Sequence, residues 1–589
     1  MTTVNKESNL GLGKVWTNRL KKIIIPKVLP KTQFNCQPDI NITDELREIR
    51  DVNNYLLGEG INKQVDGTIL SIDFKDAFRS VSHRWFNLVM KQLGVPQEFI
   101  DWFWMMYRDL YVVIVLNRYK SDKICVKRGF MEGHPPSMGA FVISMIPLMY
   151  ACEEKMTGIV TPSNRNHRIK LFADDLKLFI KNMSEVTNLY KVISNFEKVS
   201  GLEMHRDPAR KKCQALPFGL HRVHIEWPKW ITVQSTMKVV GGVFSNVEPL
   251  EKVNSDLVSK CFFDALHKSY GVKGTIFQKA YFVNTYLFSK LWFTAQFIKL
   301  DDKMLLKLLS KALDFIYAGE NEKPIRPLNF RSIIHGGIGL IHPVVKSRAL
   351  LIKHMNRSLR LLNGSIYDAD TIENIYGYKE DFIRIIEKGL STSPVKAIYD
   401  FMIQDITHRN LSLIPSRNEK RSVNVKWGVV FNNFQLFAGL SSEEKCFAWK
   451  VSQDMLAVGS RIHRKNAERR CLAILANGNL CQEIQNLGHL FQSCPNVVES
   501  YEVIILVLNN YLKRQVNFND LIHFSINHRN KPKLTCALWF SVKMMFKIFN
   551  NKSINKVQLL ADLIKELDWN LNLNRKIGSP SEMLMLKHY

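Results

Sequence analysis

The sequence RIKLFADDLKLFI at residues 168–180 decides the fold. Apolar residues flank a central acidic pair, Asp174 and Asp175, on both sides. This pattern is typical of two antiparallel strands joined by a tight turn. We therefore expect a hairpin that presents the acidic pair at its tip.

A second strand is predicted upstream, in the run TILSIDF at residues 68–74. Because side chains alternate between the two faces of a strand, Leu70, Ile72 and Phe74 are expected to face a core, and Asp73 the opposite side. None of the apolar strand residues around these aspartates needs a carboxylate for packing. The carboxylates are therefore candidates for chemistry.

The rest of the chain mixes strands with helices at first and then becomes helical. Residues 84–108 and 137–156 have apolar residues at helical spacing, whereas VVIVLN and KICVKR at 112–128 read as a short hairpin. Beyond residue 250, long amphipathic stretches such as 277–298 and 302–317 predict helices. The predicted fold class is α+β, followed by a mostly helical C-terminal region.

The composition is that of a folded, strongly basic protein. Of 589 residues, 82 are Lys or Arg and 54 are Asp or Glu, which gives a net charge of +28. An apolar fraction of 46% excludes a largely disordered chain. The charge favours a polyanionic partner, with nucleic acid ahead of a membrane surface because the charge is dispersed.

The cysteines and the apolar runs indicate an intracellular protein. Ten cysteines are spread over the chain rather than clustered as in a small secreted domain, and the first residues contain no apolar signal segment. The longest apolar run, residues 139–152, has 14 residues and falls short of the ~20 that span a bilayer. We expect a soluble protein of the nucleus and cytoplasm, with no membrane partner.

The three aspartates suggest a metal site. Carboxylates gathered on one sheet repel one another unless divalent cations neutralise them, and two such ions serve phosphoryl or nucleotidyl transfer. An Asp-Asp pair can also simply form a turn. The companion strand with Asp73 favours the metal site.

At this point the chain resembles the reverse transcriptases of LINE-type (non-LTR) retrotransposons. The order and spacing of the similar segments agree with those of the family. The segments are SIDFKDAFRSVSH (71–83, motif A), RGFMEGHPPSMGAF (128–141, motif B), LFADDLKLF (171–179, motif C), SGLEMH with Lys211 and Lys212 (motif D), MKVVGGVF (237–244, motif E) and GGIGL (336–340).

The resemblance implies a right-hand polymerase of fingers, palm and thumb, with an antiparallel palm sheet. It implies that Asp73 and Asp174 hold two Mg²⁺ ions, with Asp175 as a third, weaker carboxylate. Lys212, or Lys211, would protonate the departing pyrophosphate, although a solvated basic loop is an equal alternative.

The resemblance also places residues near the nucleotide and template. Phe78 would exclude a ribose 2′-OH and so select deoxynucleotides, unless it is a plain core residue. The other implied contacts are Phe74, Glu132, Gly133, Pro135 and Ser137, of which the last three shape the loop under the templating base, and Phe172 and Ala173, which lie beneath the primer end.

A second candidate metal site lies near the C-terminus. Cys471, Cys481, His489 and Cys494 follow the pattern C-x9-C-x7-H-x4-C, and HLFQSCP resembles the zinc knuckle of many LINE proteins. Four such ligands suit a structural Zn²⁺. The nine residues between the first two cysteines depart from the family, and buried core cysteines are the alternative.

The predicted domains follow from these segments. They are fingers and palm at 1–250, a helical thumb and connection at 251–345, a helical region at 346–465 with a linker near 406–425, a zinc knuckle at 466–500 and a helical tail at 501–589. The sequence contains no recognisable endonuclease motif, and the chain begins almost inside the predicted fingers. We therefore expect either a fragment of a longer element or a copy that does not nick target DNA by itself.

Two functions remain open at this stage. One is an RNA-directed DNA polymerase acting on an RNA template, a DNA primer and deoxynucleoside triphosphates, in an oligomeric state that the sequence leaves open. The other is a degenerate copy that at most binds nucleic acid. The resemblance places Ile40 where the family has an Arg, and Glu132 where the family has a Gln. The alternatives are that the alignment slips, or that a lysine such as Lys127 offsets the charge of Glu132. Both changes predict weak nucleotide binding.

Overall fold

The computed structural model describes residues 7–550 apart from residues 38–39, 59–64, 109, 163, 224–225, 319–323, 325, 334–335, 362–378, 407–439, 454, 457–469, 472–474, 476, 496, 523, 525 and 527–530. The linker predicted near 406–425 and the end of the predicted C-terminal tail, residues 551–589, lie outside the described residues. The chain divides into two compact units. The first unit consists of Met1–Val258, Phe293–Asp301 and Leu350–Ile383, and the second of Ser259–Trp292, Asp302–Ala349 and Arg384–Tyr589.

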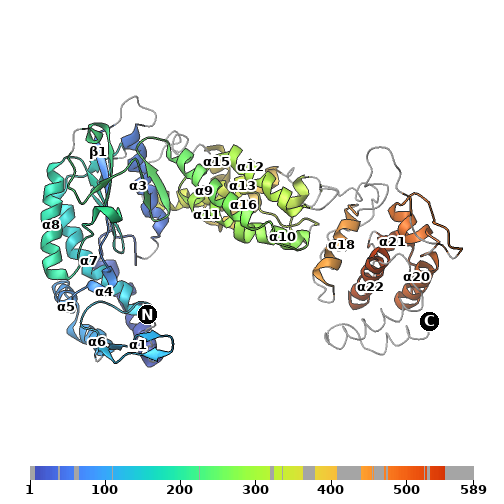
Figure 1. The fold of residues 1–589 in the computed structure, drawn as a ribbon, viewed down its shortest axis with the longest axis horizontal. Coiled ribbons are helices and arrows are strands. Elements are labelled where there is room, and N and C mark those ends of the chain that lie inside the picture. The colour runs from blue at the N-terminus through green and yellow to red at the C-terminus, as the bar shows by residue number, and fades with distance from the viewer. Residues whose placement is uncertain are drawn as a thin grey trace. The chain divides into compact units, whose positions relative to one another are not determined.

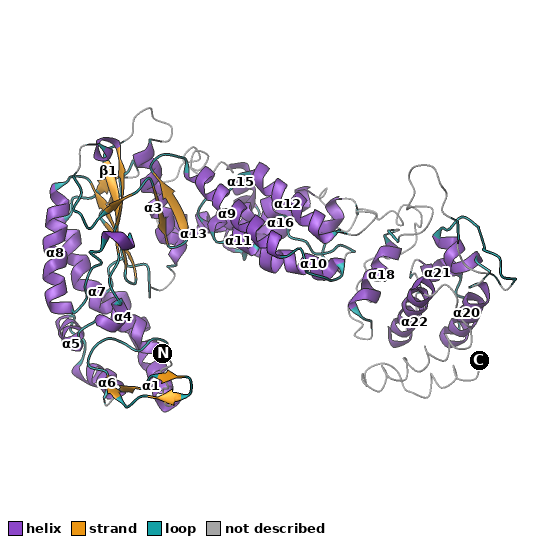
Figure 2. Ribbon diagram, viewed as in Figure 1, coloured by secondary structure: helices purple, strands orange, loops and turns teal. Residues whose placement is uncertain are grey.

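The first unit contains the strands (Figures 1 and 2). Its helices are α1 (Glu7–Arg19), α2 (Ile25–Val28), α3 (Ile42–Leu57), α4 (Ala77–Ser80), α5 (His83–Gln92), α6 (Gln97–Tyr107), α7 (Pro135–Lys155) and α8 (Ser184–Ser200). Its strands are β1 (Gly67–Ile72), β2 (Tyr111–Val112), β3 (Val115–Leu116), β4 (Tyr119–Lys120), β5 (Ile124–Cys125), β6 (Ile159–Val160), β7 (Asn166–His167), β8 (Ile169–Phe172), β9 (Asp175–Ile180), β10 (Gln214–Phe218), β11 (Thr232–Val233), β12 (Thr236–Val239) and β13 (Gly242–Ser245).

The central sheet has five strands in the order β11-β10-β1-β9-β8. All neighbouring strands run antiparallel except β10 and β11, which are parallel. The predicted strand 68–74 and the hairpin 168–180 are therefore confirmed as β1 and as β8 with β9. The short hairpin at 112–128 is also confirmed, as two small paired segments, β2 with β5 and β3 with β4.

Both faces of this sheet are covered. Leu70, Ile72 and Phe74 belong to one core, which also contains residues of α5, α6, α7 and α8. Ile69, one position out of phase, belongs to a second core with residues of α3, β12 and β13. The alternation of β1 thus separates the two cores, as its period of two requires.

Helix α3 shows how local sequence fixes an element on the second face. The Asn41 side chain accepts a hydrogen bond from Thr43 N at 3.0 Å, and Asn41 N donates to Asp44 Oδ2 at 2.8 Å. These two bonds form a capping box. The helix ends at Gly58, whose φ of 81° suits glycine.

Helix α7 is longer than the apolar run that predicted it. By length and composition it is the one helix among the described residues that could cross a membrane, and 72% of its most apolar window is buried inside the protein. Its apolar residues fill the first core.

Two later segments of the chain, Phe293–Asp301 and Leu350–Ile383, contact the rest of the first unit through packing and a hydrogen bond. Phe297 and Ile298 belong to the second core. A Cβ on Gly242 would lie 2.8 Å from the Phe297 ring, so strand β13 approaches this ring closely. The Arg47 side chain donates a hydrogen bond to the carbonyl of His354. The domains predicted from the sequence are consecutive stretches with boundaries near residues 250 and 346. They therefore do not assign these two later segments to the first unit.

Within its described part, the second unit is helical, as predicted. Its helices are α10 (Ile276–Phe282), α11 (Ser289–Trp292), α12 (Asp302–Ile316), α16 (Val395–Ile406), α18 (Ser442–Ser452), α20 (Val498–Leu512), α21 (Phe518–Ile522) and α22 (Lys531–Asn550). Helices α9 (Leu250–Lys268), α13 (Pro343–Leu361) and α15 (Lys379–Glu387) pass from one unit to the other. A buried ion pair of 2.7 Å between Lys543 Nζ and Glu444 Oε1 joins α22 to α18.

Candidate functional site

The three predicted carboxylates lie at one edge of the central sheet. Ile72, the last residue of β1, pairs with Leu176 of β9. Continuing this antiparallel register by one residue puts Asp73 opposite Asp175. Asp174 occupies the turn between β8 and β9 at the same edge. The hairpin turn consists of Ala173 and Asp174, and Asp175 already begins the return strand.

The carboxylates are partly open to solvent and act on one another. The side chains of Asp73 and Asp175 are 27% and 37% exposed. Burial raises the pKa of Asp174, and the charges of Asp175 and Asp73 raise it further. Hard oxygen ligands that repel one another at an accessible edge are the donor set that Mg²⁺ uses.

Cationic side chains compensate part of this negative charge. Lys212 Nζ lies 3.1 Å from Asp73 Oδ2, and His205 Nε2 lies 3.9 Å from the same oxygen. Lys177, whose side chain is 1% exposed, forms an ion pair with Asp175. Lys212 is therefore at the carboxylates, whereas Lys211 lies at the end of a short 3-10 turn with a φ of 49°.

A buried glutamine supports the hairpin turn from behind. The backbone of Phe34 donates to Leu171 O at 2.8 Å, so residues beside Gln33 run along β8. Gln33 Oε1 accepts a hydrogen bond from Ala173 N at 3.1 Å. Ala173 has a φ of 58°, a strained conformation for a residue with a Cβ. This hydrogen bond helps to hold the turn that presents Asp174.

The loop before α7 contains the predicted Gly133, Pro135 and Ser137. Gly133 has a φ of 81° and open space around its Cα, and Pro135 is the first residue of the helix. Ser137 is buried; its Oγ donates to Met131 O at 2.6 Å and lies 3.1 Å from the Tyr107 hydroxyl. These bonds fix the shape of the loop.

The predicted aromatic contacts fall into two groups. Phe78 is half-buried and stacks on Phe141 of α7, with ring centroids 4.4 Å apart. Phe172 is half-buried at the end of β8. Phe74 is only 3% exposed and packs on Phe196. The side chain of Phe74 therefore belongs to the core, as the alternation of its strand predicts, rather than to a surface that contacts nucleotide.

Glu132 has a partner that the sequence did not reveal. Its Oε1 accepts a hydrogen bond from Arg79 Nε at 3.0 Å, and both side chains are exposed. The carboxylate is thus compensated by Arg79, which follows motif A. Ile40 is half-buried just before the N-cap of α3, next to residues 38–39, which lie outside the described residues.

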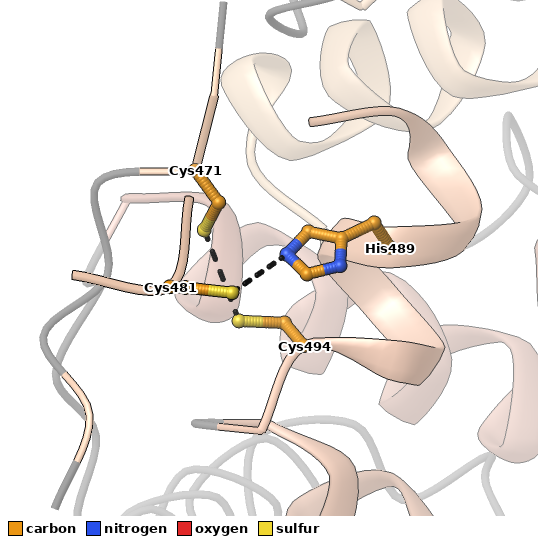
Figure 3. A group of neighbouring side chains, drawn as sticks. All are labelled: Cys471, Cys481, His489 and Cys494. Atoms are coloured by element: carbon orange, nitrogen blue, oxygen red, sulfur yellow. Dashed lines mark hydrogen bonds between the residues drawn. The ribbon is translucent and has the colours of Figure 1, made fainter. Parts of the chain in front are cut away.

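The Cys/His cluster of the second unit is assembled. Figure 3 shows Cys471, Cys481, His489 and Cys494 pointing toward one another, and their ligand atoms all lie within 4.8 Å of one another. Nine residues separate Cys471 from Cys481 in the sequence, but backbone pairing brings the two together. Arg470 forms an antiparallel β-bridge with Ile484, and Cys471 N donates to Glu483 O at 2.7 Å.

The remaining two ligands flank one turn of π-helix, His489–Ser493: His489 is its first residue and Cys494 is its C-cap. The i→i+5 hydrogen bond from Cys494 N to His489 O, 2.7 Å long, places their side chains on the same face. Burial lowers the pKa of His489, which favours the neutral imidazole, the form that binds metal.

Two distances in this cluster match the edges of a tetrahedral zinc site, and all four ligand atoms lie within 4.8 Å of one another. Zn–S bonds of about 2.3 Å and Zn–N bonds of about 2.0 Å imply edges of about 3.8 Å between two sulfurs and about 3.5 Å between sulfur and nitrogen. Cys471 Sγ and Cys494 Sγ are 3.9 Å apart, and Cys481 Sγ and His489 Nε2 are 3.5 Å apart. A disulfide would require a sulfur separation near 2.05 Å.

Three further residues were missed from the sequence. Gln33 and Lys177 support the carboxylate site, and Arg79 compensates Glu132. For Lys177 a signal existed, since a lysine interrupts the apolar strand DLKLFI two residues after Asp175. Gln33 and Arg79 carry no comparable signal, because their partners are distant in the chain.

Comparison with known proteins agrees with this geometry. Residues 11–241 match the family described as reverse transcriptase (RNA-dependent DNA polymerase). The chain carries a reverse transcriptase domain. This match covers the central sheet, the three aspartates and the loop before α7.

Two relatives are proteins of transposable elements, in keeping with the resemblance to LINE-type reverse transcriptases. The chain is 22% identical over 324 residues to the transposon TX1 uncharacterized 149 kDa protein of Xenopus laevis, covering 53% of this chain and 24% of that protein. It is 25% identical over 149 residues to the Pol polyprotein of the type-1 retrotransposable element R2 of Popillia japonica, covering 25% and 24%. The chain thus matches about a quarter of the length of either relative.

Among solved structures, the chain is similar to telomerase from Candida albicans in complex with a fragment of telomeric RNA. The similarity covers 64% of this chain and 56% of the telomerase chain, at 11% identity and a TM-score of 0.31.

Proposed function

We propose that this chain is an RNA-directed DNA polymerase that extends a primer 3′-OH on an RNA template. The observation that carries the proposal is the gathering of Asp73, Asp174 and Asp175 at one sheet edge, inside the segment that matches the reverse transcriptase family. In this proposal the sheet and α7 form the palm, the segments before β1 and around α5 and α6 form the fingers, and helices after β13 begin the thumb.

The carboxylates fit the metal that this chemistry needs. Asp73 and Asp174 would hold Mg²⁺, with Asp175 as the third carboxylate. Bound there, Mg²⁺ lowers the pKa of the primer hydroxyl and neutralises charge on the pyrophosphate. The raised pKa of Asp174 supports this assignment, because a bound cation would offset both the burial and the repulsion by Asp175 and Asp73 that raise it.

Lys212 is the group positioned to manage protons and charge beside these carboxylates. Its ammonium, 3.1 Å from Asp73, can turn toward a departing pyrophosphate without leaving the edge of the sheet. The other protein groups position substrate. Phe78, braced by Phe141, would exclude a 2′-OH, and the fixed loop from Gly133 to Ser137 would lie under the templating base.

Template, primer and deoxynucleoside triphosphates are therefore the proposed partners, in the nucleus or the cytoplasm. The charge of +28 supports binding to a phosphate backbone. In the second unit, Cys471, Cys481, His489 and Cys494 would hold one structural Zn²⁺, with no position left open for substrate.

Primer extension tests the proposal. The purified chain, supplied with Mg²⁺ and deoxynucleotides, should extend a DNA primer on a homopolymer RNA template. Changing Lys212 to Met should slow the incorporation step about a hundredfold, the size of a lost general acid. Lys211→Met is the matched control and should keep the parent rate. Absence of extension by the parent would leave the degenerate copy as the better description.

A further inference from the structure

The short hairpin between motif A and motif B has a surface that is both apolar and basic. Residues 110–128, which we call the ribbon, contain β2 to β5 (Figure 2). Almost every residue of the ribbon is exposed. Six large apolar side chains are among them: Tyr111, Ile114, Val115, Leu116, Tyr119 and Ile124.

The apolar groups are concentrated at the tip. Leu116 and Tyr119 are register partners, so their side chains stand next to each other on one face. They are 71% and 83% exposed. The turn between them, Asn117 and Arg118, has positive φ at both residues, as in a type I′ turn. A rigid turn thus holds an aromatic ring and an aliphatic group in solvent.

Cationic side chains alternate with these apolar groups. The ribbon has five of them, Arg118, Lys120, Lys123, Lys127 and Arg128, against a single acidic residue, Asp122. The cores of protein interfaces are poor in lysine. Surfaces that bind single-stranded nucleic acid combine exposed aromatic rings, on which bases stack, with cations that follow the backbone.

The residues just before and just after the ribbon are held by hydrogen bonds, Tyr107 to the loop before α7 and Gly129 to the end of α4. At its start, the Tyr107 hydroxyl accepts a hydrogen bond from Met131 N at 3.3 Å and lies 3.1 Å from Ser137 Oγ. At its end, Gly129 N donates to Val81 O at 2.8 Å. A Cβ on Gly129 would lie 2.5 Å from the Arg79 carbonyl, so this end is seated tightly.

We propose that the ribbon binds the single-stranded part of the template as it approaches the templating position, with bases on Tyr119 and Leu116 and phosphates on the neighbouring cations. The inference rests on the proposed function, since that function assigns the templating base to the loop that anchors the ribbon. A single strand is favoured over a duplex because only unstacked bases expose a face to an aromatic ring.

Binding of a labelled single-stranded RNA of about 20 nucleotides to the full chain tests the stacking part. Tyr119→Ala with Leu116→Ala should weaken binding about tenfold. Both residues are exposed, so folding should be preserved. The matched control is Tyr150→Ala on α7, a side chain 53% exposed outside the ribbon, which should bind as the parent does.

The salt dependence of the same binding tests the cations. Replacing Arg118, Lys120 and Lys123 by Ala should reduce the slope of log affinity against log salt by about 2, since each lost contact with a single strand removes about 0.7. The control replaces three exposed lysines elsewhere in the first unit, Lys91, Lys198 and Lys229, and should leave the slope closer to that of the parent.

Primer extension separates this inference from the proposed function. On a template with a long single-stranded overhang, ribbon variants should need more template than the parent for half-maximal rate. On a template with a one-nucleotide overhang, they should match it. If RNA binding falls in the variants but the parent extends no primer, the ribbon is a single-strand RNA site that serves no template, and the polymerase proposal fails.

Equal RNA binding by parent and ribbon variants would overturn the inference, whatever the polymerase does. So would a change confined to sedimentation, in which the variants bind RNA normally but lose an assembly that the parent forms. That result would make the ribbon a contact between protein chains.

Discussion

The two candidate metal sites of this chain are built in opposite ways. The carboxylates of the first unit are hard ligands at an open sheet edge, where cations of the protein itself lie against them. The Cys/His cluster of the second unit consists of softer ligands that are mostly buried and already gathered within 4.8 Å of one another. In the proposed function, the first site has to admit substrate, whereas the second only has to hold the fold together.

This contrast has a physical basis in the ligands. A carboxylate keeps its charge in water and can be shared among metal, lysine and substrate as a reaction proceeds. Thiolates and a neutral imidazole fill all four positions of Zn²⁺ and exclude water. Changes at the first site should therefore affect chemistry, and changes at the second should affect stability.

The largest expected effect is at the open site. Asp174→Asn removes a metal ligand, and we expect the rate of nucleotide incorporation to fall by at least about a thousandfold. Affinity for a primer–template should stay within about twofold, because it depends on the phosphate contacts of the basic surface. Single-turnover extension and equilibrium binding measure the two quantities.

Asp101→Asn, at an exposed position of α6, is the matched control and should leave both quantities unchanged. A parallel loss of binding in Asp174→Asn would point to a folding defect, and an unchanged incorporation rate would reject the site.

The closed site should give the reverse result. Purified parent should contain one zinc per chain, and Cys494→Ser should contain none, with early unfolding of the region around α20 and α22. Extension of a short primer–template should change by no more than a few fold. Elemental analysis and limited proteolysis provide the measurements.

Cys446→Ser is the control for the second experiment, since Cys446 is buried in α18 but is not one of the four clustered ligands. It should retain zinc. A parent without zinc would end the assignment and leave the four residues as a buried polar cluster.

The pH dependence of stability tests the surroundings of the carboxylate site, through the buried residue Glu45. Burial raises the pKa of Glu45 on α3 to about 8, and the charge of Asp175 adds to this rise. Since the folded-state pKa lies above the unfolded one, the stabilisation is complete below about pH 4.5 and is lost as pH rises toward 8. The parent should therefore lose up to about 5 kcal/mol of stability over this range.

Glu45→Gln cannot ionise, so its stability should change less between mildly acidic and mildly alkaline pH. Urea unfolding of both proteins at the two ends of the range gives the comparison. The same pH dependence in parent and variant would show that Glu45 is already ionised in the folded protein, through its attraction to Lys177.

The smallest expected effect concerns Glu132. Taken alone in the sequence, this carboxylate would repel the incoming triphosphate. The structure pairs it with Arg79 at 3.0 Å, and exposed pairs of this kind are worth at most about 1 kcal/mol. We expect Glu132→Gln to change the apparent KM for deoxynucleotides by less than about fivefold.

Arg79→Ala should raise this KM more than Glu132→Gln changes it, because it leaves the carboxylate uncompensated. The double variant should return toward the parent value. Steady-state kinetics with a single deoxynucleotide measures all three. A large drop in KM for Glu132→Gln would restore the view that this residue weakens nucleotide binding.

The sequence by itself determined the elements that carry the carboxylates. A two-residue alternation is a local property of a strand, so the faces of Leu70 and Ile69 and the hairpin at 168–180 could be predicted from neighbouring residues alone. The four ligands of the cluster could be predicted for a similar reason, because their residue types are rare and chemically specific.

Only the tertiary structure decided which distant groups complete these sites. Gln33 reaches Ala173 across 140 positions, and Arg79 reaches Glu132 across 53. The bridge from Arg470 to Ile484 closes an interval that looked too long for a knuckle. Such contacts join residues that are far apart in the sequence, and a local sequence pattern does not predict which distant residues the fold brings together. The sequence therefore identified the chemistry, and the fold supplied its positioning.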